Sequence, residues 1–106
     1  MLENITVLTA ETFQSYTANR FCLVLVFRRQ CPHCRVLMAV VDKCRPLCPD
    51  LAVAGVDADD SPGILASTGV TRVPTVLIYR DGGVSASRSG VMNASELLAL
   101  IASSSA

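Results

Sequence analysis

Two cysteines separated by two residues, Cys31 and Cys34, follow an apolar run and precede a predicted helix. The run at residues 21–27 has the length of a buried strand, and the segment from Pro32 onward has the length of a helix. Proline suits the first helical position because its missing N–H would have no partner there, so Cys31 falls near the N-cap. The unpaired amides and the positive end of the helix dipole then favour a thiolate. The sequence therefore predicts a redox centre in which Cys31 attacks disulfides and Cys34, one turn later, attacks back.

Metal binding is the main alternative for a Cys-x-x-Cys pair, because two such pairs form a zinc site. The chain also carries Cys44 and Cys48. On one helix, Cys34 and Cys44 would lie about 15 Å apart, which is too far to share one tetrahedral ion. We therefore expect redox chemistry without a metal or other cofactor. Two metal-binding alternatives stay open: a metal that bridges two chains, and a metal that recruits His33 as a further ligand.

Composition limits the partners and the compartment. The 106 residues are expected to form one domain, residues 1–106, and nine basic side chains balance nine acidic ones. No basic tract is present, so neither nucleic acid nor a membrane is an expected partner. The apolar runs are shorter than a membrane span and the first residues lack a secretory signal, which predicts a cytoplasmic protein. Five cysteines, an odd number, indicate at least one free thiol, as in a reducing compartment.

Strands and helices are expected to alternate along the rest of the chain. The expected strands are residues 5–8, 21–27, 51–56, 75–79 and 84–88, and the expected helices are residues 10–19, from 32 until Pro46, from 62 until Gly69 and 94–102. Thr9 and Asn93 are good N-caps, and Glu96 completes a capping box with Asn93. Asp81 and Gly82 predict a hairpin turn. The order βαβαβαββα predicts an α/β fold with helices on both faces of one mixed sheet.

A series of motifs in register carries a family resemblance. The motifs are Cys-x-x-Cys, Val53-Ala54-Gly55-Val56-Asp57-Ala58-Asp59 with Ser61-Pro62, Gly69-Val70-Thr71-Arg72-Val73-Pro74-Thr75, Asp81-Gly82 and Gly90. Together they resemble the thioredoxin family over nearly the whole chain. The resemblance implies the thioredoxin fold and a protein-disulfide oxidoreductase. Its partners would be protein disulfide or dithiol substrates and a reductase or other electron donor or acceptor.

The resemblance also implies a substrate surface. In that family the proline matching Pro74 is cis and lies against the active-site disulfide, and the backbone before it, at Val73, pairs with an extended substrate. Gly90 matches a glycine that keeps the surface beside the cysteines flat. Together with Pro32, these are the expected substrate-binding residues. Without the resemblance, Pro74 would ordinarily be interpreted as a trans proline at the start of a strand, and Gly90 as a turn glycine.

Four positions depart from the family pattern. They are Gln30 in place of the usual Trp, Ala39 in place of a helix-kinking Pro, Leu25 in place of the Asp buried behind the second cysteine, and Gly55 in place of that Asp's Lys partner. Without the carboxylate, deprotonation of Cys34 must use water, His33 or a group of the substrate. A non-catalytic interaction module or a redox sensor is therefore the alternative function.

His33 is expected to be a third catalytic residue instead of a solvated residue of the first helical turn. The Cys-Pro-His-Cys sequence resembles the motif of the periplasmic disulfide-forming oxidoreductases, whose inserted helical domain has no room in this chain. An imidazolium near Cys31 and the loss of the buried Asp favour the thiolate, and so predict a more oxidising centre than an ordinary thioredoxin. Four arginines are expected to cluster around Cys31: Arg28, Arg29, Arg35 and Arg72. Because arginines are mostly solvated, two of the four are expected to add positive potential and two to have no effect.

The three remaining thiols are expected to lie outside the chemistry. Cysteine is among the most buried residue types. Cys22 lies in the strand expected at residues 21–27, and the alternation of that strand is expected to point its side chain inward. Cys44 and Cys48 flank Pro46, where the helix should end. They are expected to be structural thiols, with a regulatory bridge between them as the alternative.

Overall fold

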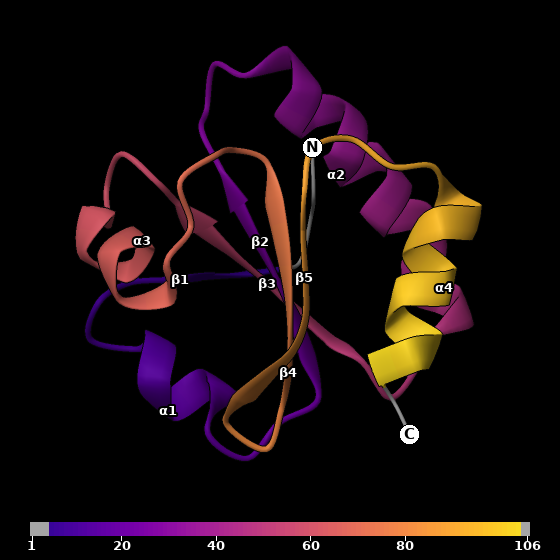
Figure 1. Cartoon of the computed structure of the whole chain (residues 1–106), viewed down its shortest axis with the longest axis horizontal. Helices are drawn as coiled ribbons and strands as arrows, with labels where there is room; N and C mark the ends of the chain where they lie inside the picture. Colours follow the sequence, from indigo (N-terminus) through magenta and orange to yellow (C-terminus); the bar gives the residue numbers. More distant parts are fainter. Residues whose placement is uncertain (1–4, 105–106) are drawn as a thin grey trace.

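Within residues 5–104, the part of the chain that the computed structural model describes, five strands form one mixed sheet (Figure 1). The elements in chain order are β1 (Thr6–Leu8), α1 (Phe13–Thr17), β2 (Cys22–Phe27), α2 (Pro32–Cys44), the 3-10 helix η1 (Arg45–Leu47), β3 (Ala52–Asp57), α3 (Pro62–Thr68), β4 (Thr75–Arg80), β5 (Gly83–Ser89) and α4 (Ala94–Ser104). The strand order is β1-β3-β2-β4-β5, with β1, β3 and β2 parallel and β4 and β5 antiparallel to their neighbours. The predicted order βαβαβαββα is confirmed.

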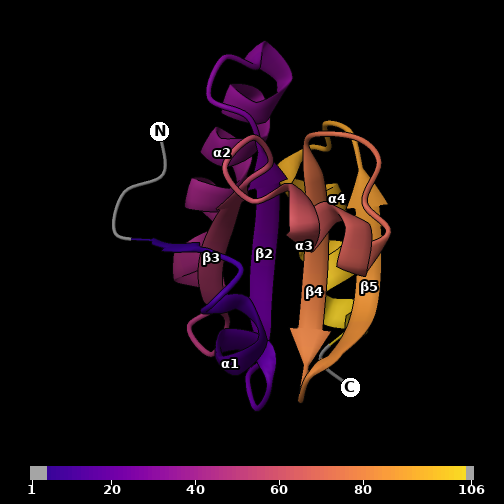
Figure 2. The same ribbon diagram turned by 90° about the vertical axis from the view of Figure 1, so that its left-hand side faces the viewer.

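Helices cover both faces of the sheet: α2 and α4 lie on one side, α1 and α3 on the other (Figures 1 and 2). The central strand β2 is buried on both faces and alternates between them. Leu23 and Leu25 belong to the cluster beneath α2 and α4, whereas Val24 and Val26 belong to the cluster beneath α1 and α3. Burial on both faces explains why residues 21–27 form a continuous apolar run.

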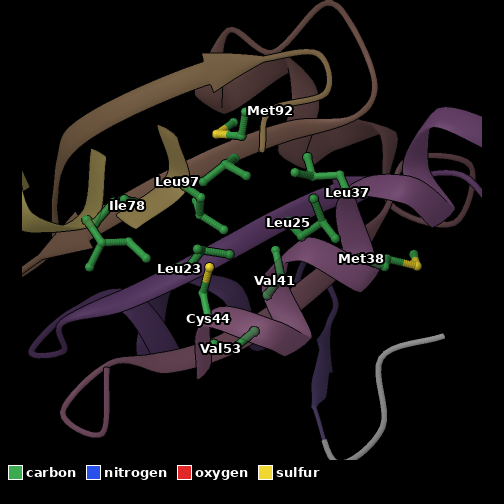
Figure 3. Close-up of a cluster of buried hydrophobic side chains, with 12 residues drawn as sticks. Leu23, Leu25, Leu37, Met38, Val41, Cys44, Val53, Ile78, Met92 and Leu97 are labelled. Carbon is green, nitrogen blue, oxygen red and sulfur yellow. The ribbon is translucent and has the colours of Figure 1, made fainter. Parts of the chain in front are cut away.

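The cluster beneath α2 and α4 supports the helix that carries the two cysteines. Leu37 and Val41 of α2 meet Leu23 and Leu25 of the sheet and Leu97 of α4 (Figure 3). All five side chains are at most 1% exposed. Side chains packed at this density hold few rotamers, so α2 has a fixed position over β2.

Short-range signals define several element ends as predicted. The Asn93 side chain accepts a hydrogen bond from the Glu96 main-chain N at 2.8 Å, and the Glu96 side chain accepts one from the Asn93 main-chain N at 3.0 Å. Asp81 and Gly82 both have positive φ, at 53° and 91°, as a two-residue hairpin turn requires. Gly69 ends α3 in the left-handed region with φ of 77°.

Helix α1 is shorter than the predicted range of residues 10–19. The prediction that Thr9 caps it was wrong, because its N-cap is Thr12. The Thr9 main-chain N donates to Thr12 Oγ1 at 2.9 Å, so these residues form a hydrogen-bonded turn before the helix begins. At the other end, Arg20 Nε donates to the main-chain O of Tyr16 at 2.7 Å and satisfies a carbonyl that the ended helix leaves open.

Candidate redox site

The start of α2 holds Cys31 and Cys34 in the predicted arrangement. Cys31 is the N-cap, with φ of −134° and ψ of 105°, and Pro32 follows in the first turn. The Cys31 Sγ accepts a hydrogen bond from the main-chain N of Cys34 at 3.2 Å. The sulfur therefore satisfies one of the open amides at the helix start.

The two sulfurs differ in access to solvent. Cys31 is partly exposed, whereas Cys34 is completely buried. Burial, assisted by the hydrogen bond to the Cys31 sulfur, raises the pKa of the Cys34 thiol to about 11, although a main-chain hydrogen bond from Arg28 acts in the opposite direction. At neutral pH Cys34 is therefore a thiol, and a substrate can reach only Cys31 directly.

The sheet brings the predicted substrate-binding residues to the end that carries Cys31. Strand β2 runs toward this end, and its residue Val26 lies directly opposite Thr75, the first residue of β4. Thr75 in turn lies opposite Ser89, the last residue of β5. Pro74, immediately before β4, therefore lies at the same end of the sheet as the cysteines.

Pro74 and Gly90 are direct neighbours. The Gly90 main-chain N donates to the Pro74 O at 2.8 Å. Pro74 is buried and the Val73–Pro74 peptide bond is cis. Gly90 has φ of +90°, and no heavy atom lies within 4 Å of the place that a Cβ would take. The surface beside Gly90 is therefore open, and its backbone conformation is one that favours glycine.

His33 and all four candidate arginines are exposed. His33 lies in the first turn of α2 between the cysteines, next to the exposed Pro32. Arg35 and Arg72 are also exposed. Solvent reduces the effect of exposed charges on a nearby thiolate, so these side chains influence Cys31 less than buried groups would.

Acidic partners balance the charges of the other two arginines, Arg28 and Arg29. Arg28 Nε lies 3.0 Å from Asp59 Oδ1, and Arg29 Nε lies 2.9 Å from Asp57 Oδ2. Arg29 Nη2 also lies 2.7 Å from Asp60 Oδ2. The sequence analysis missed this cluster. The sequence shows two arginines just after the strand β2 and three aspartates at or just after the end of β3, but their contact follows only from the parallel pairing of these two strands.

Comparison with known proteins identifies the family of this chain. A family model described as thioredoxin matches residues 4–103. The chain belongs to the thioredoxin family. It is 28% identical over 78 residues to a thioredoxin of Chlamydia caviae, which covers 74% of this chain and 76% of that protein. It is also 31% identical over 85 residues to protein disulfide-isomerase 1 of Caenorhabditis elegans, which covers 76% of this chain but only 18% of that longer protein.

A solved structure shows the same fold. It comes from work on the thiol resolving mechanism in yeast mitochondrial 1-Cys peroxiredoxin via glutathione/thioredoxin systems. The two structures superpose with a TM-score of 0.83, over 92% of this chain and 93% of that chain, at 22% sequence identity. At this identity the likeness concerns the fold alone, and with the family match it shows the thioredoxin fold.

The two positions at which the thioredoxin resemblance leads one to expect a buried Asp and its Lys partner lie side by side. Leu25 is completely buried and stands directly opposite Gly55 on β3. A Cβ on Gly55 would lie 3.0 Å from Cε1 of Phe27 and 3.2 Å from Cδ1 of Ile5. A lysine would therefore require the Phe27 ring to move, so apolar packing replaces both members of the ionic pair.

The three thiols outside the motif are buried or half-buried. Cys22 is completely buried in β2, and burial raises the pKa of its thiol to about 11. Burial also raises the pKa of Cys44, as does the neighbouring Cys48. The Cys44 Sγ donates to the Ala94 main-chain O at 3.8 Å. Within residues 5–104 there is no group of three or more His, Cys, Asp or Glu side chains placed to hold a metal ion.

Oxidation of the protein is expected to leave three free thiols. A disulfide between Cys31 and Cys34 consumes two of the five cysteines. The burial of Cys22 and Cys44 and their raised pKa values make both slow to exchange. Alkylation in denaturant followed by mass spectrometry counts the remaining thiols. A count of one would show that a second disulfide forms and would contradict the assignment of three thiols outside the chemistry.

Proposed function

We propose that this protein is a thiol–disulfide oxidoreductase that exchanges disulfides of other proteins through Cys31 and Cys34. One observation carries the proposal: the partly exposed Cys31 sulfur caps α2 and accepts the amide of the buried Cys34. The similarity of this chain to proteins named thioredoxin and protein disulfide-isomerase supports the same activity.

The reaction consists of two exchanges. The Cys31 thiolate attacks one sulfur of a substrate disulfide; an S–S bond forms to Cys31, and the other substrate sulfur leaves as a thiolate that takes a proton. Cys34 then loses its proton and attacks the Cys31 sulfur, which releases the second substrate thiol. Two electrons pass to the substrate, and Cys31 and Cys34 end as a disulfide. In the opposite direction the same steps oxidise a dithiol.

The second exchange depends on a proton acceptor for Cys34. Its pKa of about 11 makes the thiolate rare at neutral pH, and Leu25 supplies no carboxylate. We propose that water, the neighbouring His33 or a substrate group accepts the proton. Release of the mixed disulfide is then expected to become faster as the pH rises toward the Cys34 pKa.

A substrate chain is proposed to bind beside the cysteines. Pro32 is exposed next to Cys31, and the pair formed by Pro74 and Gly90 supplies a second side of the surface at the same end of the sheet. The main chain at Val73 is proposed to pair with an extended substrate. These assignments follow the resemblance of the residues to the thioredoxin pattern.

Partners and location complete the proposal. The substrates are protein disulfides or dithiols, and a reductase or another electron donor or acceptor restores the cysteine pair. In the described part of the chain, no helix has the length and apolarity required to cross a membrane. A cytoplasmic location stays a prediction.

Turnover with a disulfide-bonded protein tests the proposal. Wild-type protein with dithiothreitol should reduce the substrate faster than dithiothreitol alone, and a titration against glutathione should give the reduction potential of the cysteine pair. The missing buried carboxylate favours one second candidate, a redox sensor or binding module. Absence of turnover with every reductant tried would support that candidate.

Replacing His33 with glycine is expected to lower the reduction potential. A positively charged imidazole next to Cys31 stabilises the thiolate, which exists only in the reduced form. His33 is exposed, so the change in the equilibrium constant with glutathione should be at most about tenfold, which is about 30 mV. His33→Gln is the matched control, because it removes the imidazole without the flexibility of glycine. If neither variant shifts the potential, the histidine has no part in the redox equilibrium.

A further inference from the structure

The buried carboxylate of Asp57 lies near Leu25, the position where the thioredoxin resemblance leads one to expect a buried Asp. Asp57 is the last residue of β3 and its side chain is only 4% exposed. It is two residues beyond Gly55, so both lie on the same face of the sheet. That face is the one beneath α2, and Met38 of α2 lines the same hollow as Asp57 and Phe27. Position 25 therefore holds a leucine where the thioredoxin resemblance leads one to expect a buried Asp, and a buried carboxylate lies at the end of the neighbouring strand.

Both oxygens of Asp57 have partners. Oδ2 lies 2.9 Å from Arg29 Nε. Oδ1 accepts hydrogen bonds from the main-chain N of Asp59 at 2.9 Å and from that of Asp60 at 3.4 Å. Because a buried carboxylate costs free energy unless it is paired and hydrogen-bonded, this set of donors indicates a site built for a charged side chain.

The partner of Asp57 belongs to the loop that leads into the redox site. Arg29 lies two residues before Cys31, between the end of β2 and the start of α2. Arg28 of the same loop is paired with Asp59, and its main chain donates to the Cys34 sulfur. The ion pairs thus join this loop to the segment after β3. Two arginines against three aspartates leave the cluster with a net charge of −1.

We propose that Asp57 is a positioning residue of the redox centre: by holding Arg29, it fixes the loop before Cys31 and keeps that arginine from stabilising the Cys31 thiolate. The inference rests on the proposed oxidoreductase function. The Asp57 carboxylate thereby makes the redox centre less oxidising than the arginines alone would make it. A carboxylate at the end of β3 then adjusts the redox equilibrium of cysteines on another element.

The sign of the effect follows from which redox state is charged. Oxidation by glutathione disulfide converts the two thiols of Cys31 and Cys34 into a disulfide, forms two molecules of glutathione and transfers two electrons. Only the reduced form contains a thiolate. A more positive surrounding therefore favours the reduced pair, and a more negative one favours the disulfide.

Two single variants should shift this equilibrium in opposite directions. Asp57→Asn removes a negative charge and one of the two acidic partners of Arg29, which keeps its contact with Asp60, and should favour the reduced pair by about two- to tenfold. Arg29→Gln removes a positive charge while the two amides still support Asp57, and should favour the disulfide by a similar factor. The double variant should return close to wild type. All shifts should shrink at high salt, since the charges are partly exposed.

The controls separate electrostatics from loss of structure. Arg45→Gln removes the same charge from an ion pair with Asp42 at the far end of α2, at 3.8 Å, and should leave the equilibrium unchanged. Arg29 is 72% exposed, so its replacement is expected to fold even if Asp57→Asn does not. Shifts in the same direction for both variants, or no shift for Arg29→Gln, would overturn the inference.

Wild-type behaviour distinguishes failure of the inference from failure of the proposed function. If the wild-type cysteines do not form a reversible disulfide with glutathione, the oxidoreductase proposal itself fails. If the wild type titrates normally and the variants match it at low and high salt, only the role of Asp57 is refuted.

Discussion

Replacing Cys31 with serine should abolish disulfide reduction, with a loss of at least about 1000-fold in turnover. A serine hydroxyl is almost never ionised at neutral pH, and it lacks the nucleophilicity of a thiolate. Cys34 cannot substitute for it, because this thiol is completely buried and its pKa is raised to about 11. The measurement is the rate of reduction of a disulfide-bonded protein with dithiothreitol as the final reductant.

The Cys34→Ser variant completes this test, because it should still attack but fail to release its product. The Cys31 sulfur then stays bonded to the substrate, and mass spectrometry should detect the adduct. Cys48→Ser is the matched control, since it removes a half-buried thiol outside the site and should keep wild-type turnover. Adduct formation through Cys48 instead of Cys31 would contradict the assignment of the nucleophile.

Replacing Leu25 with aspartate is expected to cost at least about 3 kcal/mol of unfolding free energy at pH 7. The Leu25 side chain is completely buried in the central strand, opposite Gly55, where the position of a lysine partner is taken by the Phe27 ring. A carboxylate there would have lost its water without gaining an ion pair. Denaturant unfolding of the variant and the wild type measures the loss.

The pH dependence identifies the cause of that loss. Burial without a partner raises the pKa of the introduced carboxyl above its unfolded value of about 4. The folded variant then holds its proton more tightly than the unfolded chain, so its stability relative to wild type is highest at acid pH and falls as pH rises through the folded pKa. Leu25→Ala is the control: it should lose about 2–5 kcal/mol through a cavity, equally at every pH. An aspartate variant with the same pH profile as Leu25→Ala would show that the carboxylate finds a partner.

Local patterns in the sequence predicted most of the element ends. Cys31 and Pro32 defined the start of α2, Gly69 the end of α3, and Asn93 with Glu96 the start of α4. Each signal depends on residues within one turn of each other, so the sequence alone contains it. The predicted start of α1 was wrong because the Thr12 side chain accepts a hydrogen bond from the Thr9 main chain. Threonine side chains form such local turns as readily as they cap helices.

The surroundings of Cys31 were less predictable because they depend on contacts between distant segments. The positive charges of Arg28 and Arg29 were visible in the sequence, but their partners lie 28 to 31 residues further along the chain. The pairing of β2 with β3 places Asp57 opposite Phe27, two residues before Arg29, and so brings the ion pair together. The sequence identified the two cysteines, whereas the fold determines how much charge they experience.

The division of the apolar side chains into two clusters, one on each face of the sheet, affects how the molecule opens transiently. Helix α1 has five residues, and the side chain of its N-cap, Thr12, caps none of the helix amides, so α1 is among the segments expected to unfold locally at low free-energy cost. Such an opening exposes the cluster beneath α1 and α3 but leaves the opposite cluster and the hydrogen bonds on both sides of β2 in place. Partial unfolding on one side of the sheet can therefore proceed while Cys31 and Cys34 keep their native geometry.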